Sequence, residues 1–174
     1  MISSLTVRNG TKPDNILLAQ LGWQTFAEAF GPDNTPEDMA AYLPTAFSPE
    51  LQAAELADPQ NIFWLVLVND VPVGYVKLFA GLAPTCVKSQ RPLKIARLYL
   101  LQAWCGQGIG HELLQRCFQY AQENGYTSVW LTVWEKNEGA LALYQKLGFN
   151  LVGEEEFVLG QDVQRDYIME KVIL

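Results

Sequence analysis

Residues 104–114, WCGQGIGHELL, place three glycines at alternate positions between two apolar segments. The segment before them, LKIARLYLL at residues 93–101, has the composition of a strand. The segment after them has apolar residues at helical spacing. Glycine at 106, 108 and 110 lets backbone N–H groups approach a ligand that any Cβ would hold away. A glycine turn between a strand and a helix therefore predicts a phosphate site at the positive end of the helix, and a tight turn without a ligand is the alternative.

The spacing of these glycines separates the known kinds of phosphate loop. A mononucleotide loop needs a lysine followed by serine or threonine after its last glycine, and no such pair follows Gly110. A dinucleotide loop, G-x-G-x-x-G, needs a further glycine three residues after Gly110 and an acidic residue about twenty positions after the loop. This chain has Leu113 and Trp130 at those two positions. Alternate glycines instead suit a pyrophosphate that lies across the successive amides of residues 105–110.

Strand and helix patterns alternate along the chain. The expected strands are residues 4–8, 62–68, 73–82, 93–101, 127–134, 149–159 and 164–172, and the expected helices are residues 14–30, one or two within 35–58, one directly after the glycines, and one that Asn137 caps and that runs through Leu147. Strand, glycine turn, helix and strand form a parallel crossover unit, and the strands on either side make the sheet mixed. The predicted class is α/β (α+β).

Length and composition predict one domain over residues 1–174, because 174 residues with 49% hydrophobic content suffice for one sizeable core. The N-terminus lacks a signal-peptide pattern, and the longest apolar run, residues 62–68, is far below the ~20 residues that span a bilayer. We therefore expect a cytoplasmic protein that does not engage a membrane. Three cysteines and one histidine predict free thiols and no metal site.

Charge is unevenly distributed along the chain, whose net charge is -7. The first 60 residues hold eight acids against Arg8 and Lys12, whereas the remaining residues are nearly balanced. This acidity disfavours a nucleic-acid partner and favours a cationic one. An acidic surface that serves only solubility is the alternative.

The strand and loop together resemble motif A of the GCN5-related N-acetyltransferase superfamily. In that motif a strand of the type L-x-R-L-Y-V leads into [QR]-x-x-G-x-[GA]. The chain matches the strand at residues 97–100, RLYL, and the loop at Gly106, Gly108 and Gly110. It departs from the motif at Cys105, where the family has Gln or Arg. A side-chain donor to the phosphates is lost there, while the backbone amides remain.

The segment VWEKNEGALALYQKLGF, residues 133–149, is similar to motif B of the same superfamily at Asn137, Ala140, Tyr144 and Gly148. The early helices, the hairpin and the tail are similar to the PaiA-like branch, whose members acetylate polyamines such as spermidine. The resemblance implies a mostly antiparallel sheet of six to seven strands, with helices on both faces and a parallel central pair that splays apart.

The resemblance also implies acetyl-CoA as the cosubstrate. Pantetheine is expected to pair with the end of the strand at residues 98–100 as an added strand, where a backbone N–H would polarise the carbonyl. Lys146 is expected near the ribose phosphate, although a solvent-facing lysine is the alternative. The full set of expected cofactor-binding residues is Leu98, Tyr99, Leu100, Cys105, Gly106, Gln107, Gly108, Ile109, Gly110, Asn137 and Lys146.

Acetyl transfer to an amine needs a proton donor and a proton acceptor. Tyr144 is the expected donor to the departing thiolate, because a phenol with a pKa of about 10 stays protonated at neutral pH. A buried tyrosine with a purely structural role is the alternative. An alkylammonium with a pKa of about 10.4 must lose a proton before it attacks. Glu135 or Glu28 is expected to start that relay, and a solvated carboxylate is the alternative for each.

Three functions are compatible with these residues. The first is an acetyl-CoA-dependent N-acetyltransferase that acts on a small cationic amine such as a polyamine. The second replaces that amine with one on a protein or peptide, and the third is a non-catalytic acyl-CoA-binding module. The expected partners are the small-molecule amine and, in a homodimer, a second copy of the chain.

Overall fold

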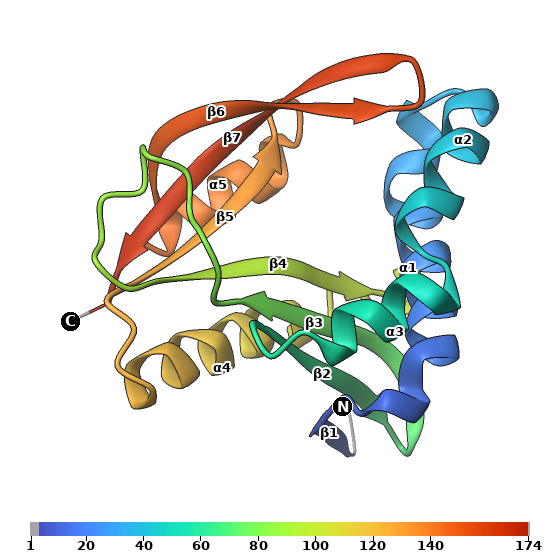
Figure 1. The fold of residues 1–174 in the computed structure, drawn as a ribbon, viewed down its shortest axis with the longest axis horizontal. Coiled ribbons are helices and arrows are strands. Elements are labelled where there is room, and N and C mark those ends of the chain that lie inside the picture. Colours follow the sequence, from blue (N-terminus) through green and yellow to red (C-terminus); the bar gives the residue numbers. More distant parts are fainter. Residues whose placement is uncertain (1–3, 174) are drawn as a thin grey trace.

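Seven strands form one sheet in the computed structural model, which describes residues 4–173 (Figure 1). In spatial order they are β1 (Leu5–Asn9), β2 (Asn61–Val68), β3 (Val71–Phe79), β4 (Pro92–Leu100), β5 (Ser128–Trp134), β7 (Asp162–Val172) and β6 (Asn150–Leu159). Only β4 and β5 run parallel, and the other neighbours in this sheet are antiparallel. The predicted class and the predicted parallel central pair are therefore confirmed.

The described residues form five α-helices, which lie on the two faces of the sheet (Figure 1). On one face, called here the α1 face, lie α1 (Asn15–Phe30), α2 (Pro36–Ala46) and α3 (Pro49–Ala57); on the other, the α4 face, lie α4 (Ile109–Glu123) and α5 (Glu138–Lys146). Residues 35–58 hold two helices because the side chains of Thr35 and Ser48 each cap a new N-terminus. Within residues 4–173 we find no helix with the length and apolar character that crossing a membrane requires.

The main core lies between the sheet and the α4 face. The apolar stripe of α4, which includes Ile109, Leu113 and Cys117, packs on side chains of the central strands and is fully or almost fully buried. Cys86, Cys105 and Cys117 are all free thiols, as predicted. A second group of clusters joins α1 and α2 to the opposite face of the sheet. The two helical layers thus pack on the central strands from opposite faces of the sheet.

The central parallel pair is joined over only three residues. Pro92, Leu93 and Lys94 of β4 pair with residues 128–130 of β5, and beyond this point β4 continues along β3 while β5 continues along β7. We call this separation the splay. The register of β4 against β3 also shifts between Arg97 and Ile95, so that Ala96 is an extra residue in β4. A bulge of this kind bends a strand and increases its twist.

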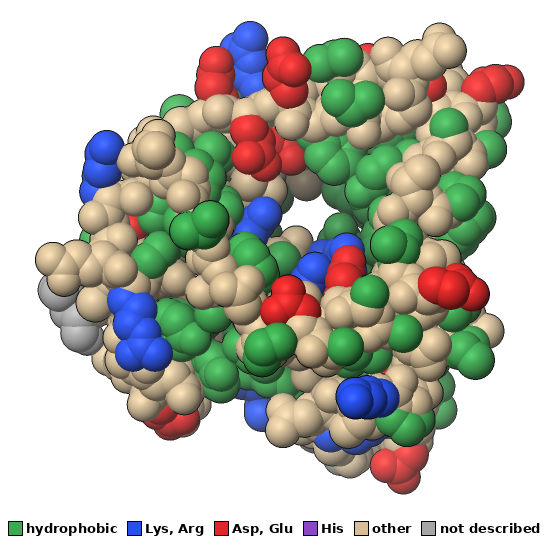
Figure 2. Space-filling view, viewed as in Figure 1, with side chains coloured by type: hydrophobic (Ala, Val, Ile, Leu, Met, Phe, Trp, Pro, Cys, Tyr) green, Lys and Arg blue, Asp and Glu red, His purple; other side chains and the backbone are tan. Residues whose placement is uncertain are grey.

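The β6–β7 hairpin crosses to the helices of the α1 face and contacts α2 (Figure 1). The backbone N–H of Gln161 donates to Asp38 at 2.9 Å, and the side-chain amide of Gln164 donates to Asn34 at 2.7 Å. The region bordered by β4, α2 and this hairpin is hollowed, with Lys and Arg side chains inside it and Asp and Glu side chains at its edges (Figure 2). We call it the hollow.

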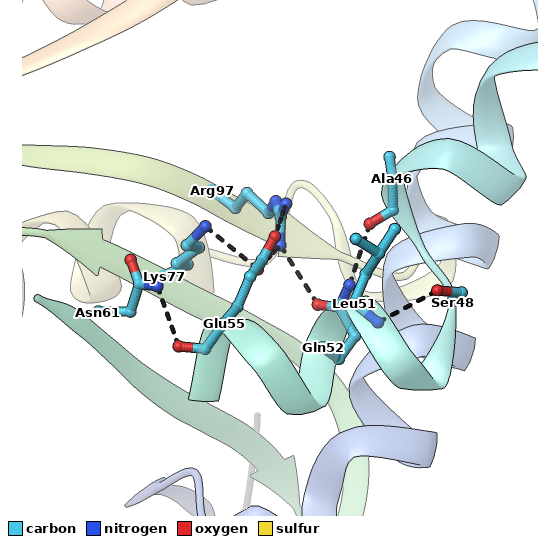
Figure 3. Close-up of polar contacts among 8 residues, drawn as sticks. All are labelled: Ala46, Ser48, Leu51, Gln52, Glu55, Asn61, Lys77 and Arg97. Atoms are coloured by element: carbon cyan, nitrogen blue, oxygen red, sulfur yellow. Dashed lines mark hydrogen bonds and ion pairs between the residues drawn. The ribbon is translucent and has the colours of Figure 1, made fainter. Parts of the chain in front are cut away.

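A charged cluster ties α3 to the sheet beside the bulge (Figure 3). Arg97 of β4 donates two hydrogen bonds to the Glu55 carboxylate, at 2.8 and 3.0 Å, and the ammonium of Lys77 lies 3.1 Å from the same group. Arg97 also donates to the side chain of Gln52 at 3.3 Å. Three elements that are far apart in the sequence are thus joined at one carboxylate.

Two opposing effects act on the pKa of the Glu55 carboxyl. Burial would raise this pKa, but the hydrogen bonds and the positive charge of Arg97, together with the charge of Lys77, outweigh burial and leave the pKa below its usual value. A carboxyl whose folded pKa is lowered stabilises the fold above its unfolded pKa, and this contribution is lost as the pH falls through the folded value.

We predict that Glu55→Gln lowers the free energy of unfolding at pH 7 by about 3 kcal/mol, because it leaves Lys77 and Arg97 partly buried with no counter-charge. Urea denaturation measures the loss. Glu50→Gln, on the exposed first turn of the same helix, is the matched control and should cost less than about 1 kcal/mol. Equal losses for the two variants would contradict the role given to the cluster.

Candidate active site

The glycine loop joins the end of β4 to α4 in a conformation that requires glycine at two positions. Gly106 has a φ of 76° and Gly108 a φ of 86°, both in the left-handed region. Gly108 immediately precedes the first residue of α4. A Cβ built at either glycine meets no heavy atom within 4 Å, so there is open space on that side of the backbone. The space beside these two glycines, at the N-terminus of α4, is therefore open to a ligand such as a diphosphate.

The side chains of the loop contribute less than its backbone. Cys105 is exposed, and its thiol points back to the carbonyl oxygens of Leu100 and Leu101, at 3.8 and 3.6 Å. The side-chain amide of Gln107 donates to the carbonyl of Ala103 at 2.9 Å. Gly110 lies inside the first turn of α4, where a Cβ would make an ordinary contact with Leu100, so its conformation does not demand glycine. Backbone amides are thus the donors that this loop offers to an anion.

The strand end that precedes the loop presents an unpaired edge toward β5. Leu98 and Leu100 pack on the core of the α4 face, whereas Tyr99 packs against aromatic rings of the α1 face. The ladder with β5 ends at Lys94, so the polar backbone groups of residues 95–100 on that edge face the splay. An extended chain such as pantetheine can pair with this edge as an added strand. The loop and the splay together therefore fit coenzyme A.

The candidate residues of α5 lie on the same side of the sheet as the loop. Tyr144 packs in the core cluster of the α4 face, with its ring centroid 5.6 Å from that of Phe149. Burial raises the pKa of Tyr144, and the nearby Cys117 raises it further, so its phenol is protonated at neutral pH. Asn137 accepts a hydrogen bond from the amide of Ala140 and caps the helix, and Lys146 is exposed.

The two carboxylates expected to start a proton relay lie in different places. Glu28 of α1 accepts a 2.7 Å hydrogen bond from the backbone N–H of Gln102 and a 2.9 Å hydrogen bond from Gln24, so both of its oxygens are engaged. Glu135 follows the last residue of β5, and its carboxylate lies 3.9 Å from the guanidinium of Arg165. Glu28 therefore links α1 to Gln102, just after β4, whereas Glu135 lies near the β6–β7 hairpin.

The fold brings near each other two charged residues that no sequence pattern singled out, Lys94 and Asp166. Lys94, the last residue of β4 that pairs with β5, lies with its ammonium 4.8 Å from the ring centroid of Trp130. Asp166 of β7 pairs in register with Trp134 and Glu155. Burial raises the pKa of Asp166 to about 6, and Glu155 raises it while Lys94 lowers it. The only sequence signal was the alternation of β7, which does not say which strand lies opposite.

Comparisons with known proteins agree with this geometry. The model of the Acetyltransferase (GNAT) family matches residues 23–149. An uncharacterised N-acetyltransferase of Lactobacillus delbrueckii subsp. lactis is 35% identical over 155 residues, which is 87% of each chain, and one of Mycobacterium bovis is 30% identical over 157 residues, 90% of this chain and 96% of the relative. The chain therefore belongs to the GNAT acetyltransferase family.

Solved structures share the fold at lower identity. The PaiA N-acetyltransferase of Thermoplasma acidophilum, crystallised with coenzyme A, superposes with a TM-score of 0.75 at 20% identity and covers 97% of this chain and 99% of its own. The ribosomal-protein-S18-alanine N-acetyltransferase of Escherichia coli gives 0.70 at 17% identity, with 98% and 94% covered. The chain is an acetyl-CoA-dependent N-acetyltransferase, and acetyl-CoA is its cosubstrate.

We predict that Gly108→Ala weakens coenzyme A binding at least tenfold. The new Cβ has no steric conflict within the protein, but it strains the left-handed backbone and fills the space beside the amides. Isothermal titration calorimetry with coenzyme A measures the affinity. Gly31→Ala, at a position with equally open space and a right-handed φ, is the matched control and should bind as the wild type does. Unchanged affinity in Gly108→Ala would remove the loop from the binding site.

Proposed function

We propose that the protein transfers the acetyl group of acetyl-CoA to the primary amine of a small cationic acceptor such as a polyamine. The observation that carries this proposal is an acidic groove at the end of β5 and along the β6–β7 hairpin. Lys136 and Arg165 are the basic residues that line it. The carboxylates that line it are Asp33, Glu135, Glu154, Glu155, Glu156 and Asp162.

This groove supports a cationic acceptor on electrostatic grounds. Several carboxylates around one concavity raise the local concentration of cations and orient them. The groove includes Trp134, the last residue of β5, and β5 forms one side of the splay, so an acceptor held in the groove lies beside a strand that borders the splay. A chain with several ammonium groups can leave one at the hairpin while another reaches the thioester.

The proposed chemistry divides between the two faces of the sheet. On the α4 face, the loop amides hold the diphosphate and the edge of β4 holds the pantetheine, with a backbone N–H at residues 98–100 polarising the thioester carbonyl. Tyr144 gives its proton to the sulfur as the thioester bond breaks. On the α1 face, the acceptor amine approaches through the hollow. Cosubstrate and acceptor thus meet at the splay from opposite sides.

Three parallel assays of acetyl-CoA consumption test the acceptor class, with spermidine, with a lysine-containing peptide and with no acceptor. We expect turnover with spermidine well above that with the peptide, and a spermidine KM that rises with salt because the groove attracts cations. Preference for the peptide would instead indicate a protein or peptide N-acetyltransferase. Coenzyme A binding without turnover of any amine would indicate a non-catalytic module.

We predict that Tyr144→Phe lowers kcat about 100-fold or more, because it removes the proton donor to the thiolate while keeping the ring in place. The dissociation constant for coenzyme A should stay within about twofold of the wild type, since the loop and β4 are untouched. Tyr120→Phe on α4, whose ring stacks on Tyr126 away from the glycine loop, is the matched control. Equal losses in kcat and in cofactor affinity would count against the acid role.

The remaining expectations from the sequence stay predictions. They are a cytoplasmic location, a single domain over residues 1–174 and a homodimer. All of the expected cofactor contacts, the acid role of Tyr144 and a proton-relay role for Glu135 or Glu28 also stay predictions.

A further inference from the structure

Asp166 is placed by β7 on the wall of the hollow. Alternate residues of a strand share a face, and two neighbours of Asp166 on its face have known contacts. Gln164 binds Asn34 beside α2, and Ile168 packs with Trp130 on the α1 face. Asp166 lies between them and is half-buried. Its carboxyl therefore faces the acceptor side of the splay.

Charged and titratable groups from three other elements face this carboxyl. Lys94 of β4 attracts it, and Glu155 of β6 repels it. Burial is the main cause that raises the pKa of Tyr99 on β4 and of Tyr42 on α2, and the negative charge of Asp166 adds to it in both, so Asp166 lies within electrostatic range of both phenols. Asp166 is thus a carboxylate that is influenced by, or influences, charged and titratable groups on β4, β6 and α2.

We propose that Asp166 is the general base that removes a proton from the acceptor ammonium, directly or through one water. This inference rests on the proposed function. The ammonium gives one proton to the Asp166 carboxylate, which releases it to solvent, and the neutral nitrogen attacks the thioester carbonyl. A C–N bond forms as the C–S bond breaks. The nitrogen then loses a second proton to solvent, while Tyr144 gives its proton to the thiolate and takes one back from solvent. The net products are the amide, the thiol and one proton in solution.

Lys94 and Glu155 act on this base in opposite directions. The positive charge of Lys94 holds Asp166 ionised and also disfavours a second cation beside it, which assists loss of a proton from the bound ammonium. The negative charge of Glu155 makes the Asp166 carboxylate a stronger base. A base with a pKa of about 6 is ionised at neutral pH and still accepts a proton readily. Lys94 and Glu155 thus adjust the pKa of Asp166 in opposite directions.

The first test compares Asp166→Asn with the wild type in kcat and in the pH dependence of kcat/KM for spermidine. We expect kcat at pH 7.5 to fall about 100-fold or more, the KM to change less than threefold, and the acid limb near pH 6 to disappear. Glu170→Gln is the matched control, because Glu170 lies on the same strand and face as Asp166 but pairs with Trp130, where β4 and β5 are still joined. This variant should keep both kcat and the acid limb of the pH profile. An unchanged limb, or a raised KM with unchanged kcat, would overturn the inference.

The second test shifts the acid limb of the pH profile while Asp166 itself is unchanged. Lys94→Met removes the charge that lowers the pKa of Asp166, so the acid limb should move to higher pH. Glu155→Gln removes the charge that raises it, so the limb should move to lower pH. Shifts in these opposite directions identify Asp166 as the titrating group. Absent shifts, or shifts in one direction for both variants, would contradict it.

A stability measurement tests the same carboxyl independently of turnover. Because its pKa is higher in the folded state than the usual unfolded value near 4, Asp166 favours folding at low pH, and this contribution is lost as the pH rises through about 6. The difference in Tm between Asp166→Asn and the wild type should therefore be more positive at pH 7.5 than at pH 4. An equal difference at both pH values would contradict the inference.

The outcomes separate this inference from the proposed function. A wild type that acetylates no amine would overturn the proposed function and the base with it. An active wild type whose Asp166→Asn variant keeps its rate and pH profile would overturn only the base. Asp166→Glu serves if Asp166→Asn does not fold, because it keeps a carboxylate and should retain the acid limb at a reduced rate; loss of the limb would count against the inference.

Discussion

The structure depends on the early end of the ladder between β4 and β5. Each strand keeps its outer neighbour, so the sheet stays intact, but the inner edge of β4 loses a partner after Lys94. Backbone polar groups need partners, and an unpaired edge readily accepts another chain. The bulge at Ala96 bends β4 where the strands separate. The separation of this parallel pair thus leaves an open edge of β4 between the two faces of the molecule.

The same separation explains where the charged residues lie. Arg97 and Lys77 are partly buried beside the bulge, and Glu55 from α3 compensates them. Lys94 lies where the β4–β5 ladder ends, and its charge acts on Asp166, which pairs in register with Glu155. Burial works against the ionised forms of five of these groups, namely Glu55, Lys77, Lys94, Arg97 and Asp166. The charges are therefore retained at a cost in stability, as is typical of sites that must bind or move protons.

Local patterns predicted the parts of the site that depend on neighbouring residues in the chain. The alternate glycines, the strand before them and the apolar stripe after them predicted the phosphate loop, because the required φ angles are properties of Gly106 and Gly108 themselves. The hairpin of β2 and β3, the cap at Asn137 and most strand bounds followed from similar local rules. Asp166 gave no such signal, because its importance comes from β4 and α2 rather than from its own neighbours.

The sequence by itself determined the elements, their order and the conformation of the loop, since these depend on backbone preferences and on hydrophobic spacing within a few residues. Only the tertiary structure decided where the β4–β5 ladder ends and that the β6–β7 hairpin reaches α2. It also decided which carboxylates face the hollow. These features depend on pairing between segments far apart in the chain, where a shift of one residue would turn each side chain to the opposite face.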